Sequence, residues 1–217
     1  MVEPFIRNHQ YNLIRKQAGI LQQATRTVSD PKVLEAVRYS AESKVLEGFS
    51  EVTETQREIL EKFSELKAAE DFQHYLSSLV PFLVEFPKVT EKEIKKLFAK
   101  NKKLTLPDLA TLNYRHFTYI GWTDISTTKW FLVYHLRGQV VGVEGKYTLT
   151  NKKDICSLCN SFGEVALVSA MSKSRPANTS PDYYKSVGNY MCINSHACNK
   201  NITDTTSLER FIQSVIQ

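Results

Sequence analysis

The four cysteines of this chain have the residue type and spacing that most readily support chemistry. Cys156 and Cys159 form a Cys-x2-Cys pair, and Cys192 and Cys198 follow as a second close pair after 32 intervening residues. Thiolates two residues apart on a tight turn can occupy adjacent corners of a tetrahedron, which is the geometry that Zn²⁺ prefers. The pattern therefore predicts a structural zinc site with no position left for a substrate.

Two alternatives stay open for these cysteines. His196 lies between Cys192 and Cys198 and could replace either thiolate as the fourth ligand. A Cys-x2-Cys pair can also be a redox or disulfide site, but residues 154–156 do not supply the thioredoxin-like strand and turn that such a site needs. In a reducing compartment, paired cysteines are more often metal ligands than disulfides, so we expect zinc.

Enzyme motifs are absent from the sequence. Gly142 and Gly145-Lys146 resemble a phosphate-binding loop, but the glycine spacing is too short and no Ser or Thr directly follows Lys146. We expect Gly145 and Lys146 to form a turn. The histidines outside the cysteine region are scattered, and none lies beside a candidate nucleophile. The chain is therefore expected not to be an enzyme.

Composition places the chain among ordinary globular proteins, with 42% hydrophobic and 24% charged residues in 217. The first ten residues lack an apolar signal segment, and no run approaches the roughly 18 apolar residues that would span a membrane. A cytoplasmic location without membrane contact is expected. Residues 1–87 hold 10 Lys+Arg against 13 Asp+Glu, whereas residues 88–217 hold 18 against 10. The basic second part favours an acidic partner, either nucleic acid or protein.

The fold class predicted is α+β, with a helical bundle in residues 1–86 and a zinc-binding domain in residues 87–217. Apolar residues recur at helical spacing along the first part, where Asp30-Pro31 and Thr53 to Gln56 are typical helix starts. Four amphipathic helices with short connections would pack as an antiparallel bundle.

The second part begins with a short basic helix that starts at Thr90 and is followed by strands. β-Branched and aromatic runs at residues 117–122, 130–134, 140–143, 165–168 and 189–191 predict an antiparallel sheet. A helix over residues 204–216 closes the chain. A zinc knuckle, a hairpin and a terminal helix are the parts of a treble-clef-like finger, so this domain is expected to be mixed α/β.

Two groups of side chains are candidates for binding a partner. Lysines crowd the end of the basic helix between Lys95 and Lys103, where they could contact RNA or an acidic protein, or simply form a solvated helix end. Tyr183, Tyr184, Lys185 and Tyr190 precede Cys192 on a loop that a zinc site would hold rigid. Such residues suit a protein interface or stacking on RNA bases, or else they cover the core of a small finger.

With these motifs in order, the chain resembles the elongation factor G-binding proteins of the FusB type, a family of fusidic acid resistance proteins. The resemblance spans nearly the whole chain. It is carried by these segments: His9-Gln-Tyr-Asn12, Leu97-Phe98 with the lysines to Lys103, Tyr119-Ile-Gly-Trp122, Trp130 to Tyr134, Gly142-x2-Gly145, Cys156-x2-Cys159-Asn160, and Gly188-x-Tyr190-x-Cys192-x5-Cys198-Asn199.

The resemblance implies a non-enzymatic, monomeric module with a four-cysteine zinc domain. Members bind the C-terminal domains of elongation factor G and promote its release from ribosomes on which fusidic acid has trapped it, without binding or modifying the drug. The implied partner-facing positions are Ile155, Val187, Tyr190 and Phe211, although a phenylalanine on the terminal helix can equally be a core residue. The family has an aromatic residue at the first of these and a lysine at the second, so Lys185 could supply the missing charge.

A second interpretation, from a different class, is a zinc-finger protein that binds ribosomal RNA through the lysines and the tyrosine loop. Salt-dependent RNA binding without the factor would favour it. A third interpretation, a thiol redox enzyme, would require the cysteines to cycle between thiol and disulfide.

Overall fold

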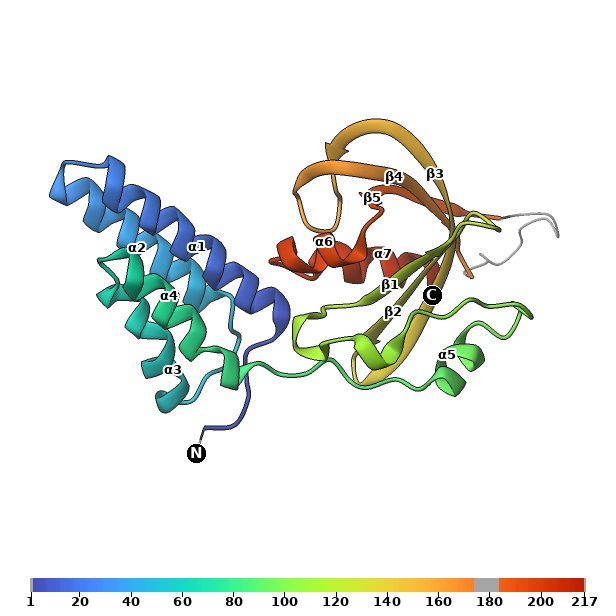
Figure 1. Ribbon diagram of the computed structural model, residues 1–217, viewed down its shortest axis with the longest axis horizontal. Coiled ribbons are helices and arrows are strands. Elements are labelled where there is room, and N and C mark those ends of the chain that lie inside the picture. The colour runs from blue at the N-terminus through green and yellow to red at the C-terminus, as the bar shows by residue number, and fades with distance from the viewer. Residues whose placement is uncertain (1, 174–183, 217) are drawn as a thin grey trace. The chain divides into compact units, whose positions relative to one another are not determined.

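The computed structural model describes residues 2–173 and 184–216 and divides the chain into two compact units (Figure 1). The helical unit comprises Met1–Val84 and the sheet unit comprises Glu85–Gln217. The division falls two residues before the boundary expected from the sequence. No helix among the described residues is both long enough and apolar enough to cross a membrane.

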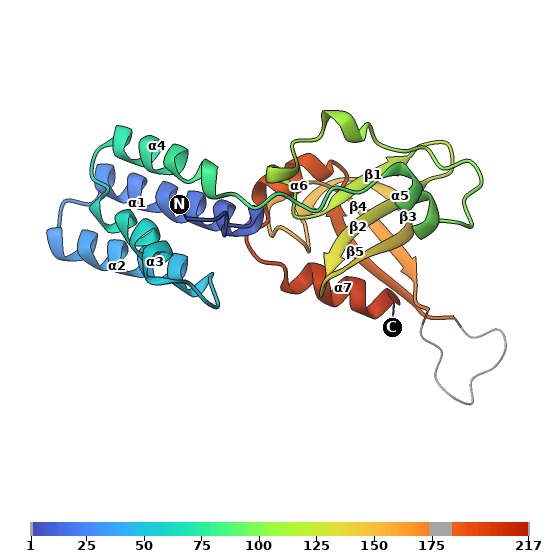
Figure 2. The ribbon, with the colours of Figure 1, turned by 90° about the horizontal axis from the view of Figure 1, so that it is seen from below.

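The helical unit contains four α-helices: α1 (Asn8–Thr27), α2 (Pro31–Glu47), α3 (Glu54–Glu61) and α4 (Ala69–Ser78). Short 3-10 turns follow at Lys62–Glu65 and Val80–Phe82. The carboxylate of Asp30 accepts a hydrogen bond from the amide of Lys32 at 2.8 Å, which caps α2. Thr53 and Gln56 form the expected capping box at the start of α3. Figures 1 and 2 show the helices lying beside one another, joined by short turns, and their buried side chains form one apolar core.

Over its described residues the sheet unit has five strands in sequence order, and every neighbouring pair is antiparallel. The strands are β1 (Ile120–Asp124), β2 (Lys129–Leu136), β3 (Gln139–Ile155), β4 (Phe162–Met171) and β5 (Ser186–Cys192). Arg137 and Gly138 both have positive φ and form the tip between β2 and β3, as expected. Ten residues of the loop expected before β5, 174–183, lie outside the described residues, including Tyr183.

Helices cover the two faces of β2. Trp130, Leu132 and Tyr134 share a core with α7 (Thr206–Ile216), whereas Phe131 and Val133 share a core with α5 (Glu91–Leu97). All five side chains are buried, which explains why β2 is an unbroken apolar run rather than an alternating one. Two 3-10 turns, Leu109–Thr111 and Tyr114–His116, lie between α5 and β1.

The turn expected at Gly145 and Lys146 is wrong, because both residues lie within β3, which is 17 residues long. Gly145 pairs with Trp130, and a Cβ atom added to it would lie 2.8 Å from the carbonyl oxygen of Ser169. The glycine therefore permits a close approach between strands rather than a reversal of the chain. A second departure is α6 (Ser195–Asn201), a short helix that the sequence reading did not predict.

Candidate metal centre

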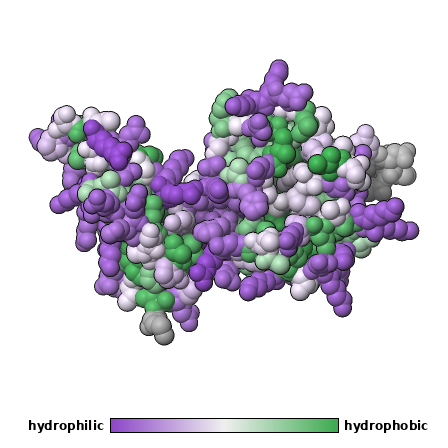
Figure 3. Space-filling model, viewed as in Figure 1, coloured by the Kyte–Doolittle hydropathy of each residue, from purple (hydrophilic) through white to green (hydrophobic). Residues whose placement is uncertain are grey.

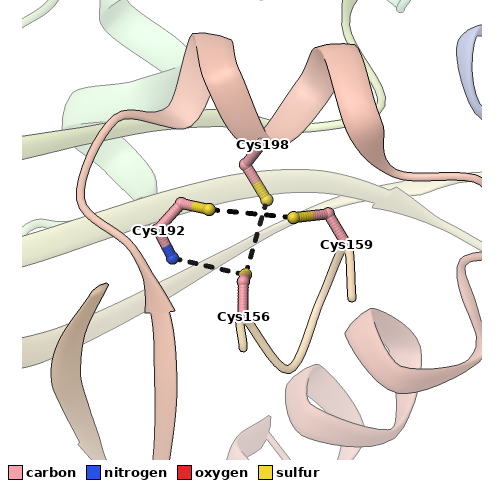
Figure 4. Close-up of side chains that lie close together, drawn as sticks. All are labelled: Cys156, Cys159, Cys192 and Cys198. Carbon is pink, nitrogen blue, oxygen red and sulfur yellow. Dashed lines mark hydrogen bonds between the residues drawn. The ribbon is translucent and has the colours of Figure 1, made fainter. Parts of the chain in front are cut away.

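The four cysteines come together from three parts of the sheet unit (Figure 4). Cys156 and Cys159 lie on the turn between β3 and β4, Cys192 is the last residue of β5, and Cys198 lies on α6. All four are free thiols, and all but the partly exposed Cys192 are buried. A knuckle, a strand end and a helix thus contribute ligands to one site.

The sulfur positions fit a tetrahedral metal site. The Sγ atoms of Cys156 and Cys198 are 3.9 Å apart, those of Cys159 and Cys192 are 3.7 Å apart, and all four lie within 4.8 Å of one another. Four thiolates bound at about 2.3 Å around one zinc ion would be separated by about 3.8 Å. The donor set and its spacing therefore suit a thiolate-binding ion such as Zn²⁺.

Electrostatics also favour a cation among these thiols. Hydrogen bonds from Cys159, Cys192 and Cys198 lower the pKa of Cys156 well below its usual range. Hydrogen bonds to Cys156 raise the pKa of Cys192 and of Cys198 above the usual range. A thiolate at Cys156 thus disfavours ionisation of Cys192 and Cys198, whereas the pKa of Cys159 is lowered to about 7. A divalent cation would offset this repulsion and allow all four groups to bind as thiolates.

Backbone hydrogen bonds fix the knuckle and connect it to β5. The amide of Asn160 donates to the carbonyl oxygen of Cys156 at 2.9 Å, and Asn160 itself takes a left-handed conformation that closes the turn. The amide of Cys192 donates to Sγ of Cys156 at 3.3 Å, and that of Ser157 donates to the carbonyl oxygen of Tyr190 at 2.8 Å. The position of Tyr190 is therefore coupled to the ligand turn.

Asn199, the residue after Cys198, anchors α6 to the start of β1. Its side-chain oxygen accepts hydrogen bonds from the amides of Thr118 at 2.7 Å and Tyr119 at 3.2 Å. Its side-chain nitrogen donates to the carbonyl oxygens of Tyr119 and Ser195, both at 2.9 Å. The side chain is buried and fully satisfied. The sequence analysis named Asn199 only as part of a family motif. Its role could not be predicted, because its partners Thr118 and Tyr119 lie about 80 residues away in the sequence.

Gly121 provides the space in which this junction forms. A Cβ atom there would lie 2.7 Å from the ring of Tyr119 and 3.2 Å from Cβ of Ser195. The hydroxyl of Ser195 donates to the carbonyl oxygen of Gly121 at 2.6 Å, so α6 is held against β1 by a second residue. Glycine is therefore favoured at position 121 of the Gly-Trp motif, because a larger residue would collide with Tyr119 and crowd Ser195.

His196 does not belong to the cluster of possible metal ligands among the described residues. Its exposed ring packs edge-on against Phe117, with 5.2 Å between the ring centroids. The four-cysteine set is therefore the one that the geometry brings together.

The residues expected to face a partner fall into different environments. Tyr190 is 45% exposed, Ile155 is 57% exposed, and Tyr184 and Lys185 are also exposed. Val187 is partly buried and packs against the core. Phe211 is only 3% exposed and packs against Trp130, as a core residue does, and its contact with a partner stays a prediction. An amphipathic helix must place one apolar stripe inward, and Phe211 lies on that stripe with Leu208, Ile212 and Val215.

Sequence reasoning missed two exposed apolar residues beside these positions. Phe162, 72% exposed, lies directly opposite Ile155 on the neighbouring strand. Leu167, 40% exposed, lies directly opposite Tyr190. Figure 3 shows hydrophobic patches among hydrophilic side chains on one face of the molecule. Strand register, which the sequence did not give, was needed to find both pairs.

Comparison with known proteins gave three findings. A family described as elongation factor G-binding protein, N-terminal, matches residues 5–87, and a family described as FBP C-terminal treble-clef zinc-finger matches residues 95–214. A search of curated proteins found no match. A solved structure described as that of the fusidic acid resistance protein FusC has a TM-score of 0.80 and 21% sequence identity, and the alignment covers 98% of each chain.

The solved structure shows a shared fold over the full length, and the two family matches follow one another in the same order as the two units. The treble-clef match spans the knuckle, β5 and α6, which together carry all four cysteines. This chain therefore belongs to the FusB-type family of elongation factor G-binding proteins.

Proposed function

We propose that this protein is a non-catalytic binding module that engages elongation factor G, promotes its release from the ribosome and thereby protects translation against fusidic acid. Family membership supports the choice of partner. The fold shared with a protein described as a fusidic acid resistance protein supports the link to the drug. The observation that carries the proposal in this chain is two cross-strand pairs of exposed apolar residues in the same sheet unit as the four-cysteine cluster.

The partner-binding residues in this proposal are Ile155, Phe162, Leu167 and Tyr190, with Tyr184 and Lys185 nearby in sequence. Ile155 and Phe162 form one cross-strand pair, and Leu167 and Tyr190 form the other. Exposed apolar and aromatic side chains of this kind are typical of the central contacts of protein interfaces. Phe162 lies opposite Ile155 in the strand register, so an aromatic residue neighbours the position at which the resemblance implies one.

Zinc would act here as a structural cofactor held by Cys156, Cys159, Cys192 and Cys198. With four protein ligands it has no open position, so it would supply no chemistry to a substrate. Its contribution would be to hold the turn and β5 together. The hydrogen bond from Ser157 to Tyr190 would then keep one proposed contact residue in a fixed place.

Release of a trapped factor requires a difference in affinity. A ligand shifts a conformational equilibrium only by the amount that it binds one state more tightly than the other. We therefore propose that the module binds the departing conformation of elongation factor G, through the C-terminal domains of the factor, more tightly than the ribosome-trapped conformation. A monomer in the cytoplasm suffices for this action.

Calorimetry with purified elongation factor G tests the proposal. The zinc-loaded protein should bind at one to one, and Tyr190→Ala and Phe162→Ala should each weaken binding at least tenfold, as expected for interface anchors. Ile125→Ala is the matched control, because Ile125 is 82% exposed but lies on the turn after β1. Absence of binding by the unmodified protein would overturn the proposal.

A ribosome assay separates binding from release. Elongation factor G held on ribosomes by fusidic acid and GDP should dissociate faster when the protein is added, and Tyr190→Ala should remove the acceleration. Binding without faster dissociation would leave a factor-binding protein that does not rescue translation, which would contradict the release step.

A further inference from the structure

The most strongly charged part of the sheet unit lies on and around α5. Within residues 88–103 there are seven exposed lysines and two glutamates. We call the seven lysines the lysine surface, and they are Lys88, Lys92, Lys95, Lys96, Lys100, Lys102 and Lys103. Hydrophilic side chains project from this part of the molecule in Figure 3.

Neither glutamate neutralises most of this charge. Glu91 pairs with Lys95 at 3.0 Å, and the carboxylate of Glu93 accepts hydrogen bonds from the backbone and hydroxyl of Thr90, both at 2.7 Å. Lys95 is the one member of the lysine surface with an ion pair among the described residues. Lys92 and Lys96 lie four residues apart on α5 and repel each other, which costs folding free energy that a polyanion would offset.

The helix that carries Lys92, Lys95 and Lys96 packs closely on the sheet. Ile94 and Phe98 are buried, and Phe98 contacts Phe131 and Trp122 with ring centroids 5.0 Å and 5.8 Å apart. A Cβ atom at Gly142 would lie 2.8 Å from the ring of Phe98, so the absence of a side chain there lets α5 lie directly on β3.

Asn101 fixes the second half of the lysine surface. Its side-chain nitrogen donates to Glu144 at 2.6 Å, and its side-chain oxygen accepts a hydrogen bond from Lys129. Lys129 and Glu144 also form an ion pair at 2.6 Å. Asn101 lies between Lys100 and Lys102, so this contact holds both neighbours at a defined place above β2 and β3. Glu144 pairs with Lys129 and also interacts electrostatically with Lys100, so this one carboxylate offsets only part of the charge of the lysine surface.

The composition of the surface distinguishes nucleic acid from protein as its partner. No large exposed apolar residue occurs between Val84 and Ile125, a stretch that the structure describes in full. Protein interfaces usually have an apolar and aromatic centre and are depleted in lysine. Phosphate contacts need only positioned cations. The exposed apolar pairs of this unit instead lie near the cysteines.

We propose that the lysine surface binds the phosphate backbone of structured RNA, independently of the contact with elongation factor G. The protein would then hold two partners of different chemistry, a protein at the apolar pairs and RNA at the lysines. The interaction would be insensitive to base sequence, because lysines that contact phosphates carry no sequence information.

Fluorescence anisotropy with a labelled RNA hairpin of about 30 nucleotides tests this proposal on the full zinc-loaded chain. We expect binding at 50 mM salt, with a plot of log affinity against log salt whose slope is about −3 to −6. The triple variant Lys96→Glu, Lys100→Glu, Lys102→Glu should bind at least tenfold more weakly and with a slope shallower by about 2 to 3. Asn101→Ala, which removes only the anchor, should weaken binding by about two- to fivefold.

The matched control reverses three exposed lysines of the helical unit, Lys16→Glu, Lys32→Glu and Lys44→Glu, and so changes the net charge equally. This control should bind RNA within about twofold of the unmodified chain. Equal losses in both triple variants, or no RNA binding at 50 mM salt, would overturn the proposal. Competition by polyglutamate at the same charge concentration as RNA would also overturn it, since that result would indicate an acidic protein partner.

Calorimetry with elongation factor G on the same variants separates this inference from the proposed function. The lysine variant should keep its affinity for the factor within about threefold, whereas Tyr190→Ala should lose factor binding and keep RNA binding. Loss of both interactions in the lysine variant would contradict two independent surfaces. A second triple variant, Lys96→Gln, Lys100→Gln and Lys102→Gln, removes the charges without reversing them. Circular dichroism of both variants checks that they are folded.

Discussion

The backbone amide of Ser157 donates a hydrogen bond to the carbonyl oxygen of Tyr190 at 2.8 Å. Ser157 lies between two cysteines of the cluster, and Tyr190 is an exposed aromatic residue two positions before a third. This hydrogen bond links the backbone of the cysteine turn directly to the backbone of an exposed residue on β5. Events at the cluster and at this surface should be linked in experiments.

Removal of metal tests this link. We expect one zinc ion per chain by elemental analysis, and chelation should cause a cooperative change in tryptophan fluorescence together with loss of elongation factor G binding. Both tryptophans lie in the sheet unit, so their emission reports on that unit alone. Metal binding at structural thiolate sites typically supplies on the order of 10 kcal/mol of folding free energy. Unchanged fluorescence and binding in a metal-free sample would contradict the structural role of zinc.

Phe211→Ala should mainly lower the stability of the protein, whereas Tyr190→Ala should mainly lower its affinity for elongation factor G. Phe211 is buried against Trp130, so its truncation should lower the free energy of unfolding by about 3–5 kcal/mol. Tyr190 is half-exposed, so its truncation should cost less than about 1 kcal/mol. Urea denaturation measures both values. Below the unfolding transition Phe211→Ala should keep its affinity for the factor within about threefold, and a tenfold loss there would identify Phe211 as a contact residue.

Asn199→Ala should destabilise the sheet unit. The change leaves two buried amides and two carbonyl groups without their side-chain partner, and we expect a loss of about 2–4 kcal/mol in the free energy of unfolding. Asn201→Ala is the control, because Asn201 is exposed and makes one side-chain hydrogen bond, to Ala197. Tryptophan fluorescence in urea compares the two, and equal stabilities would show that Asn199 does not anchor α6.

Gly145→Ala and Gly163→Ala form a second matched pair. An alanine Cβ at Gly145 meets the backbone oxygen of Ser169 at 2.8 Å, and a backbone atom in a paired strand cannot easily move. We expect a loss of about 1–3 kcal/mol. At Gly163 no atom lies within 4 Å of the added Cβ, so the change should stay within about 0.5 kcal/mol. Thermal denaturation measures both, and similar melting temperatures would contradict the steric argument.

Local sequence was sufficient for features that depend on neighbouring residues. Asp30, Thr53 and Thr90 cap their helices as expected, and the hairpin tip lies at Arg137 and Gly138. Cysteine spacing likewise indicated a metal site, because two close pairs have few other uses in a reducing compartment. The resemblance to a family, carried by motifs in order along the chain, agrees with the family matches.

Features that depend on distant contacts could not be read in the same way. Glycines usually mark turns, so Gly145 was assigned to one, and only the position of Ser169 across the sheet explains its place in a strand. An aromatic residue on a helix can face either side, and the sequence alone did not show that Phe211 is buried against Trp130. The pairs Ile155 with Phe162 and Leu167 with Tyr190 required strand register, which a one-residue slip would change completely.

The interior position of β2 in the sheet also affects how often each strand opens locally to solvent. β2 is hydrogen-bonded to β1 and β3 and covered on both faces, whereas β5 pairs with β4 alone among the described strands. Amide protons of residues 131–133 should therefore exchange with solvent last, and those of β5 much earlier. Tyr190 therefore lies on an edge strand that should open more often than β2, and a bound metal or partner would slow the exchange of amide protons in that strand.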